Sequence, residues 1–160
     1  MLVFEIIRVA LQAIGANKMR SLLTMLGIAG ANDYVVKYSR QTFSETGRQA
    51  VGKDPHVSLA RQNDLLYVPC QNSNTVFVLD RDTLAADPSI LVLSAHGAGM
   101  SRNGKAFYTT NLAGGGTGGL VEIDTGTNTA VGVFDTPLPV PHNIALAPNG
   151  TRSLSCRLTP

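Results

Sequence analysis

Histidine is the residue of this 160-residue sequence best suited to chemistry near neutral pH, and the chain contains three of them. They are His56, His96 and His142, at intervals of 40 and 46 residues. A free imidazole titrates near pH 6.5, and its neutral form is a common ligand of transition metals. Three rings brought together could bind zinc or copper, or serve as acid and base. Which of these chemistries is possible depends on how the surrounding strands and turns place the three rings.

The three histidines occupy one position of a repeated pattern. Each is followed after seven residues by an asparagine, and the residue after that is Asp or Gly. The stretches read PHVSLARQND at 55–64, AHGAGMSRNG at 95–104 and PHNIALAPNG at 141–150. Asn-Asp and Asn-Gly pairs tolerate the positive φ angles of tight hairpins, so each stretch predicts a strand that ends in a turn.

Three further strands complete each repeat. The second strands are LLYVPC at 65–70, KAFYTTN at 105–111 and TRSLSC at 151–156. Third strands are predicted at 35–39, 75–80 and 120–124, and fourth strands at 48–52, 89–93 and 130–134. Four short strands per 40 to 46 residues are typical of a β-propeller blade. We therefore predict an all-β fold for residues 32–160, a partial β-propeller of about three four-stranded blades.

Two other positions of the repeat carry polar or reactive residues. Asp80 and Asp124 follow the third strand, where an aspartate most often braces a turn, and Ser39 takes this place in the first repeat. The serine argues against a catalytic duty shared by all repeats. Cys70 and Cys156 are also equivalent to each other, and sites two blades apart are too distant for a disulfide.

The repeat region resembles the YVTN-type, or YncE-like, family of seven-bladed propellers. The resemblance rests on LLYVPCQNSNTVFVLDRDTL at 65–84 and on GKAFYTTN, LVEIDTGTN and PHNIALAPNGT, and it covers about residues 34–156. The family implies a ring of about seven repeats, whereas this sequence supplies fewer than three complete ones. An open arc leaves apolar blade faces uncovered. We therefore expect a fragment from a fused or truncated reading frame, with assembly of several copies into a ring as the alternative.

Residues 1–31 form a separate segment with two apolar stretches joined at Gly15, Ala16 and Asn17. Polar residues Glu5, Arg8 and Gln12 recur at helical spacing, which predicts a hydrophobic, amphipathic α-helix suited to a membrane interface. The run ANKMRSLLTMLGI resembles the N-terminus of MacB-like ABC-transporter permeases, over about residues 4–28. In that family this run introduces the first transmembrane helix.

Two other interpretations of residues 1–31 remain open. In a signal peptide, Lys18 and Arg20 would form the positive flank and Ala29-Gly30-Ala31 the cleavage site. A soluble helical extension packed on the repeats is the third interpretation. Both membrane interpretations place the basic residues in the cytoplasm and send the repeats outward. We therefore expect a periplasmic or other extracytoplasmic location, tethered to the inner membrane if the segment is not cleaved.

The repeat also predicts where the histidines lie. In a propeller of this kind, the residue before the innermost strand lies near the mouth of the central channel, which makes His56, His96 and His142 candidates for ligand binding. We expect them on one side of the structure, with His96 midway. No carboxylate recurs beside all three, since Asp54 is near only the first. We expect spacings wider than the roughly 3 to 4 Å that shared metal ligation requires, and hence no metal or other cofactor.

Composition narrows the classes of function. The net charge is only +2, and the basic residues are scattered, which excludes a nucleic-acid groove. The sequence favours a non-catalytic, exported or membrane-tethered propeller-repeat protein with a binding or scaffold role and an unknown ligand. Its expected partners are the membrane, through residues 1–31, and further copies, through exposed blade faces. The alternatives are a truncated permease-like membrane protein and a metal-binding or lactonase-like propeller.

Topology is open to a direct test. Because Lys18 and Arg20 precede the apolar run, a reporter enzyme fused after Asn32 should be active outside the cytoplasm. The activity should be weak, since the apolar run of 21–31 is about half of the roughly 20 residues that span a bilayer. Activity confined to the cytoplasm would remove both membrane interpretations.

Overall fold

The computed structural model describes residues 33–60, 63–112, 119–136, 140–147 and 153–157. The side chains of 58–59 and 153–157 are not among the described ones. The helix expected within residues 1–31 lies outside this part of the chain. Among the described residues, no helix has the length and apolar content needed to span a membrane.

Almost all regular structure in the described residues is antiparallel β-sheet, as the sequence predicted. The strands are β1 (Asp33–Tyr38), β2 (Glu45–Val51), β3 (Ser58–Ala60), β4 (Leu65–Cys70), β5 (Thr75–Asp80), β6 (Ala86–Leu91), β7 (Ala95–Met100), β8 (Ala106–Asn111), β9 (Gly119–Asp124), β10 (Thr129–Asp135), β11 (Pro141–Leu146) and β12 (Ser153–Arg157). A short 3₁₀ turn, η1 (Gln71–Ser73), follows β4. The predicted all-β class is thus confirmed.

The strands form four sheets whose order follows the chain. β3-β4-β5-β6 and β7-β8-β9-β10 are four-stranded meanders, while β1-β2 and β11-β12 are two-stranded. Equivalent residues pair in the same register, since Val35 faces Gln49, Val76 faces Ile90 and Leu120 faces Phe134. β1 and β2 are therefore the third and fourth strands of a blade. Within the described residues, the arc consists of two whole blades with half a blade on each side.

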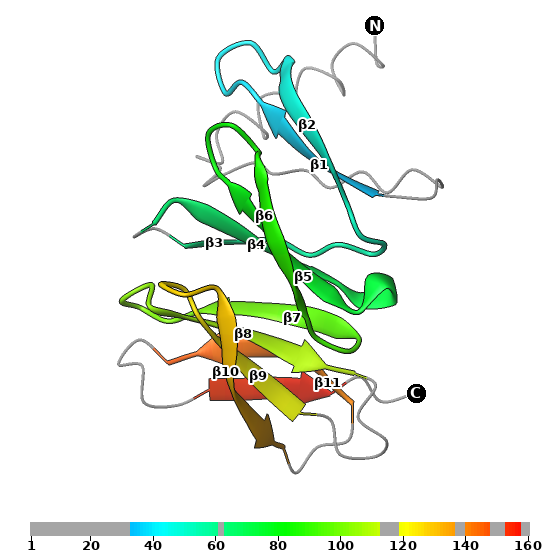
Figure 1. Ribbon diagram of the computed structural model, residues 1–160, viewed down its shortest axis with the longest axis vertical. Coiled ribbons are helices and arrows are strands. Elements are labelled where there is room, and N and C mark those ends of the chain that lie inside the picture. The colour runs from blue at the N-terminus through cyan, green and yellow to red at the C-terminus, as the bar shows by residue number, and fades with distance from the viewer. Residues whose placement is uncertain (1–32, 61–62, 113–118, 137–139, 148–152, 158–160) are drawn as a thin grey trace, which may run out of the picture.

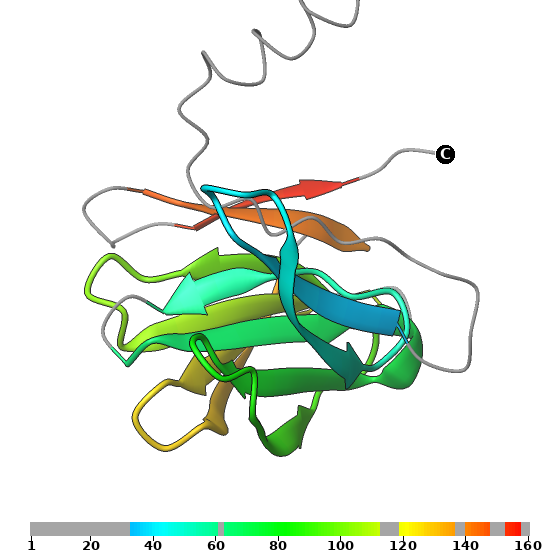
Figure 2. The same cartoon turned by 90° about the horizontal axis from the view of Figure 1, so that it is seen from above.

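The sheets are stacked in sequence order. Figure 1 shows β1–β2 at the top, then the β3–β6 sheet, then the β7–β10 sheet. Seen from above, β6 and β10 lie on one side of the stack, and β3, β7 and β11 lie toward the other (Figure 2). The first strand of each blade is thus the inner strand of a propeller-like arc, and the fourth is the outer strand.

Apolar side chains between successive sheets form the core. Between β1–β2 and the next blade, Val35 and Val51 pack with Leu66, Val68 and Leu79. Between the two whole blades, the Tyr67 and Phe107 rings stack with centroids 5.0 Å apart. The buried residues around these rings are Ala60, Val76, Val78, Ile90, Val92, Ala95, Val121 and Ile123. Burial of this apolar area between blades is the main source of stability.

The turns after the third strands are braced as predicted. The Asp80 carboxylate oxygen Oδ1 accepts the backbone N–H groups of Asp82 and Thr83, at 2.9 and 2.7 Å. Asp124 Oδ1 does the same for Gly126 and Thr127, at 2.8 and 2.9 Å. In the first repeat, the Ser39 hydroxyl accepts the N–H groups of Gln41 and Thr42. Aspartate and serine therefore serve the turn, which is a structural role.

The predicted positive φ angles also occur at the hairpins that follow the inner strands. Asp64 has φ 56° and Gly104 has φ 70°. These residues come directly after Asn63 and Asn103, whose side-chain oxygens accept backbone N–H groups of Leu65 and Lys105. The third pair, Asn149-Gly150, lies outside the described residues.

One face of the last whole blade is incompletely covered. Ile90 and Phe134 hold the same register position in successive blades. Ile90 packs against the β7–β10 sheet and is 9% exposed, whereas Phe134 is 49% exposed. The comparison indicates that a further blade surface is needed over β9–β10.

This open face generates a prediction on stability. Residues 33–160 produced alone should aggregate, self-associate or melt without a cooperative transition, because the outer blade faces are only partly covered. Differential scanning calorimetry over a series of protein concentrations measures this. A sharp melt of a monomer, independent of concentration, would contradict the partial-propeller interpretation.

Candidate functional site

The backbone adopts the same conformation before each of the three histidines. Two residues before each of them, the chain adopts a left-handed conformation, with φ of 58° at Asp54, 43° at Ser94 and 59° at Val140. This kink leads the chain into the inner strand of the next sheet. His96 and His142 are the second residues of β7 and β11, and His56 lies just before β3. The repeat therefore places three imidazoles at equivalent points of adjacent sheets.

The three rings form a continuous row. The His96 ring centroid lies 4.1 Å from that of His56 and 3.9 Å from that of His142. His96 is thus roughly equidistant from His56 and His142, as expected. The expectation of wide spacing is wrong, because neighbouring imidazoles are in direct contact.

A glycine explains this close approach. A Cβ on Gly97 would lie 2.7 Å from the His142 carbonyl oxygen, a distance that only glycine avoids. The Gly97 N–H donates to the Thr110 hydroxyl at 2.7 Å, and that hydroxyl donates to the His142 carbonyl at 3.3 Å. β7 and β11 are thus held together beside the histidines. The sequence contained this signal, since glycine directly follows His96 but neither of the other two histidines.

The central imidazole is buried without hydrogen-bond partners. His96 is only 6% exposed, and neither of its ring nitrogens has a partner among the described residues. The same is true of His56 Nε2, although the His56 residue is half-buried. A buried polar atom without a partner costs about 1–3 kcal/mol. Such groups therefore need an explanation, and an ion or ligand is one of the usual ones.

Burial also sets the protonation of the row. The pKa of His96 is lowered to about 4, mainly by burial and then by the neighbouring His56 and His142 rings, against an opposing effect of Asp54. Burial is likewise the main cause that lowers the pKa of His56. At neutral pH both rings are uncharged, and an uncharged imidazole has one nitrogen with a free lone pair.

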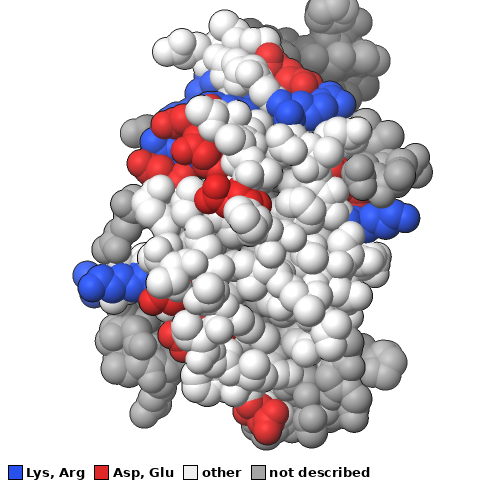
Figure 3. Space-filling model, viewed as in Figure 1, with Lys and Arg blue, Asp and Glu red and all other residues white. Residues whose placement is uncertain are grey.

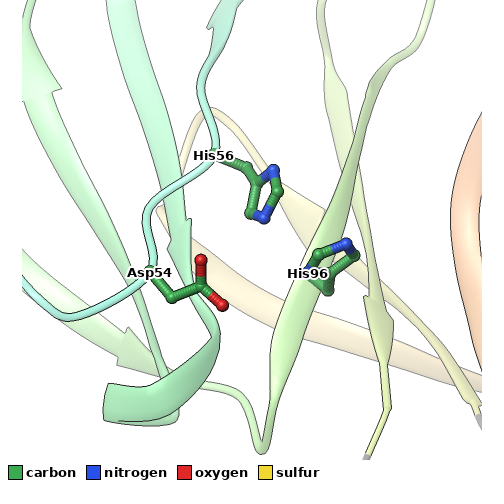
Figure 4. A group of neighbouring side chains, drawn as sticks. All are labelled: Asp54, His56 and His96. Carbon is green, nitrogen blue, oxygen red and sulfur yellow. The ribbon is translucent and has the colours of Figure 1, made fainter. Parts of the chain in front are cut away.

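Asp54 joins two of the histidines. Its carboxylate is turned toward the His56 and His96 rings in Figure 4, and one ligand atom from each of the three residues lies within 4.8 Å of the others. The Asp54 N–H donates to the Asp33 carboxylate at 2.8 Å, which fixes the kink. Sequence reasoning set Asp54 aside because it does not recur. Its position two residues before a histidine was the signal, since Asp tolerates the left-handed conformation that this position requires.

Cys70 offers no second reactive centre. The residue is buried, and burial raises the pKa of its thiol to about 12, so the thiol is protonated at neutral pH. Its Sγ contacts the Val68 carbonyl oxygen at 3.4 Å, and the thiol is free. The side chain of Cys156 is outside the described residues. The row of histidines with Asp54 is therefore the candidate site.

Comparison with known proteins identifies the fold. No protein-family model matches this chain, and no curated protein does. The hydrazine synthase of Kuenenia stuttgartiensis is similar in structure, with a TM-score of 0.71 and 20% identity over 86% of this chain and 45% of that one. The Dos1 propeller has a TM-score of 0.58 and 14% identity, over 78% of this chain and 37% of that one.

A third structure is similar, the dihydro-heme d1 dehydrogenase NirN in complex with DHE. Its TM-score is 0.55, with 15% identity over 79% of this chain and 28% of that one. The chain thus spans less than half the length of each of these three proteins. At this identity the likeness shows the fold, which is a β-propeller fold.

The burial of His96 generates a prediction on pH. Its folded-state pKa of about 4 lies below the value of about 6.5 expected for the unfolded chain. The unfolded chain therefore binds more protons in this interval, and the His96 contribution to stability is lost as the pH falls through it. NMR titration of the full chain in non-ionic detergent with a chelator should give a His96 midpoint near 4. The resonance is assigned by its loss in His96→Gln, and a midpoint at or above about 6.5 contradicts the burial.

Proposed function

We propose that this chain is a non-catalytic β-propeller-repeat protein of the YVTN type, exported or membrane-tethered, with a binding and scaffold role. The observation that carries the proposal is the exposure of Phe134 at a position where Ile90 is buried by the next blade. A blade face that lacks its neighbour is a docking surface for another blade-like surface. The scaffold role is exercised through this face.

The surface around Phe134 supports docking. Val131 and Val133 of the same strand are 59% and 69% exposed. Since Val133 and Phe134 are consecutive strand residues, β10 exposes apolar side chains on both of its faces. The side of the molecule that carries β6 and β10 is largely uncharged, and its charged side chains gather in a few groups (Figure 3). Exposed apolar side chains on a surface with little charge are typical of protein interaction surfaces.

A second copy of the chain fits this face best. The surface that covers Ile90 within the chain comes from a blade of the same repeat, through Phe107, Val121 and Ile123. A second copy presents blades of this same composition. In addition, β12 pairs with β11 alone among the described strands, which leaves an edge for a further strand. Self-association through blade faces follows.

Export and tethering rest on residues 1–31. The resemblance of residues 4–28 to MacB-like permeases and the basic residues Lys18 and Arg20 both support a membrane-associated N-terminus with the repeats outside the cytoplasm. A non-catalytic role is favoured because the recurring polar residues Asp80 and Asp124 are engaged in turns. A lactonase-like activity would rest on likeness of fold alone.

Substitution of Phe134 tests this role. Phe134→Ser in the full chain should shift the oligomer distribution toward the monomer, because it removes apolar area from the docking face. Sedimentation velocity in non-ionic detergent, across a series of protein concentrations, measures the shift. Phe43→Ser is the matched control, since Phe43 is 68% exposed but lies in the β1–β2 turn. A monomeric parent chain, or equal effects of both substitutions, would refute self-association through this face.

A further inference from the structure

The buried end of the histidine row has the composition of a metal site. Asp54, His56 and His96 come from two adjacent sheets, and one ligand atom of each lies within 4.8 Å of the others. Two imidazoles and a carboxylate are a ligand set that suits divalent zinc and its neighbours in the transition series. We infer that Asp54, His56 and His96 bind a transition metal ion, Zn²⁺ in the first place. This inference goes beyond the scaffold role and does not rest on it.

The unpaired nitrogens are the independent observation behind this inference. Both nitrogens of His96 and the Nε2 of His56 are buried and have no partner among the described residues. Hydrophobic contacts do not compensate a buried ring nitrogen, whereas a metal ion takes the lone pair of a neutral imidazole. One ion takes one nitrogen of each ring, so it accounts for the His56 Nε2 and for one of the two His96 nitrogens.

Asp54 supplies the charge that the histidines lack. A divalent cation between neutral rings alone would be poorly compensated, and the Asp54 carboxylate offers a negative oxygen ligand. Asp54 is exposed while His96 is buried, so the site is closed on the His96 side and open on the Asp54 side. Three protein ligands with one open side leave the fourth position of a tetrahedral ion to water or to a ligand.

The geometry requires only a small adjustment. Ligand atoms around a tetrahedral zinc ion lie about 3 to 4 Å apart, as bond lengths of about 2.0 to 2.2 Å dictate. The atoms here lie within 4.8 Å, so side-chain rotations suffice. The backbone is already fixed, because the His56 N–H donates to the Pro69 carbonyl at 2.8 Å and Asp54 is held by Asp33.

His142 has a different role in this site. Its ring contacts His96 at 3.9 Å between centroids, but it is not part of the group whose ligand atoms converge. Val140, which corresponds to Asp54 in its repeat, brings no carboxylate. His142 therefore packs against the His96 ring and holds it in place as a positioning residue.

Zinc titration of the full chain, without a polyhistidine tag and in non-ionic detergent, tests the inference. Competition with a chromophoric chelator should give one zinc ion per chain with micromolar or tighter affinity. His56→Ala, His96→Gln and Asp54→Asn should each weaken binding by at least about tenfold, because even the loss of groups that only orient ligands costs about 10- to 100-fold. Co²⁺ in place of zinc should give the visible spectrum of four-coordinate nitrogen and oxygen ligation.

Matched control variants distinguish binding at this site from binding by other side chains of the protein. Asp82→Asn removes an exposed carboxylate elsewhere and should leave the zinc affinity unchanged. His142→Ala should change the affinity far less than His96→Gln. Circular dichroism verifies the fold of each variant, and the exposed Asp54 keeps the test valid if His96→Gln unfolds. The inference is overturned if the chain binds no zinc or if binding survives His56→Ala and Asp54→Asn. It is also overturned if His142→Ala or Asp82→Asn weakens binding as much as the site variants do.

Discussion

The packing of each sheet on the next is the interaction on which the rest of this structure depends. A single blade of four short strands buries its apolar residues only where a neighbour covers them. Tyr67 and Phe107 show this directly, because each belongs to a different sheet and each is fully buried by the other. The same interaction brings the inner strands together, since sheets stacked face to face in an arc converge at their first strands. The position of every histidine follows from it.

This convergence comes with an energetic conflict at the inner strands. β7 and β11 approach closely at Gly97, the His96 ring contacts both neighbouring imidazoles, and burial removes water from the His96 nitrogens. Unpaired polar atoms destabilise the fold by about 1–3 kcal/mol each, an amount that apolar packing between the sheets offsets. A site that is costly without a ligand gains stability when a ligand binds, since anything that binds only the folded state shifts folding toward it. Propeller packing and ligand binding at this site are therefore coupled.

The sequence predicted the periodic features well and the local exceptions poorly. Strand order, the hairpin turns at Asp64 and Gly104 and the braces at Asp80 and Asp124 recur between the two whole blades, so pattern alone identified them. The contact between the histidines was missed because distance across sheets depends on one non-repeating residue, Gly97. Asp54 was likewise not predicted as part of the site, because an aspartate precedes only one of the three histidines. A repeat pattern predicts the residues that recur in the fold, but it does not predict the role of a residue that occurs in one repeat only.

Asp54 illustrates how a repeat scaffold acquires a site. The position two residues before the histidine requires a left-handed backbone in all three described repeats, and Asp54, Ser94 and Val140 all adopt it. Aspartate is among the residues that tolerate this conformation at small cost, whereas the β-branched Val140 is strained in it. An aspartate here is both the easier choice for the backbone and the one that adds a negative charge beside two neutral imidazoles. One aspartate in one repeat thus adds a carboxylate to two of the histidines and completes the group of three side chains that we propose as metal ligands.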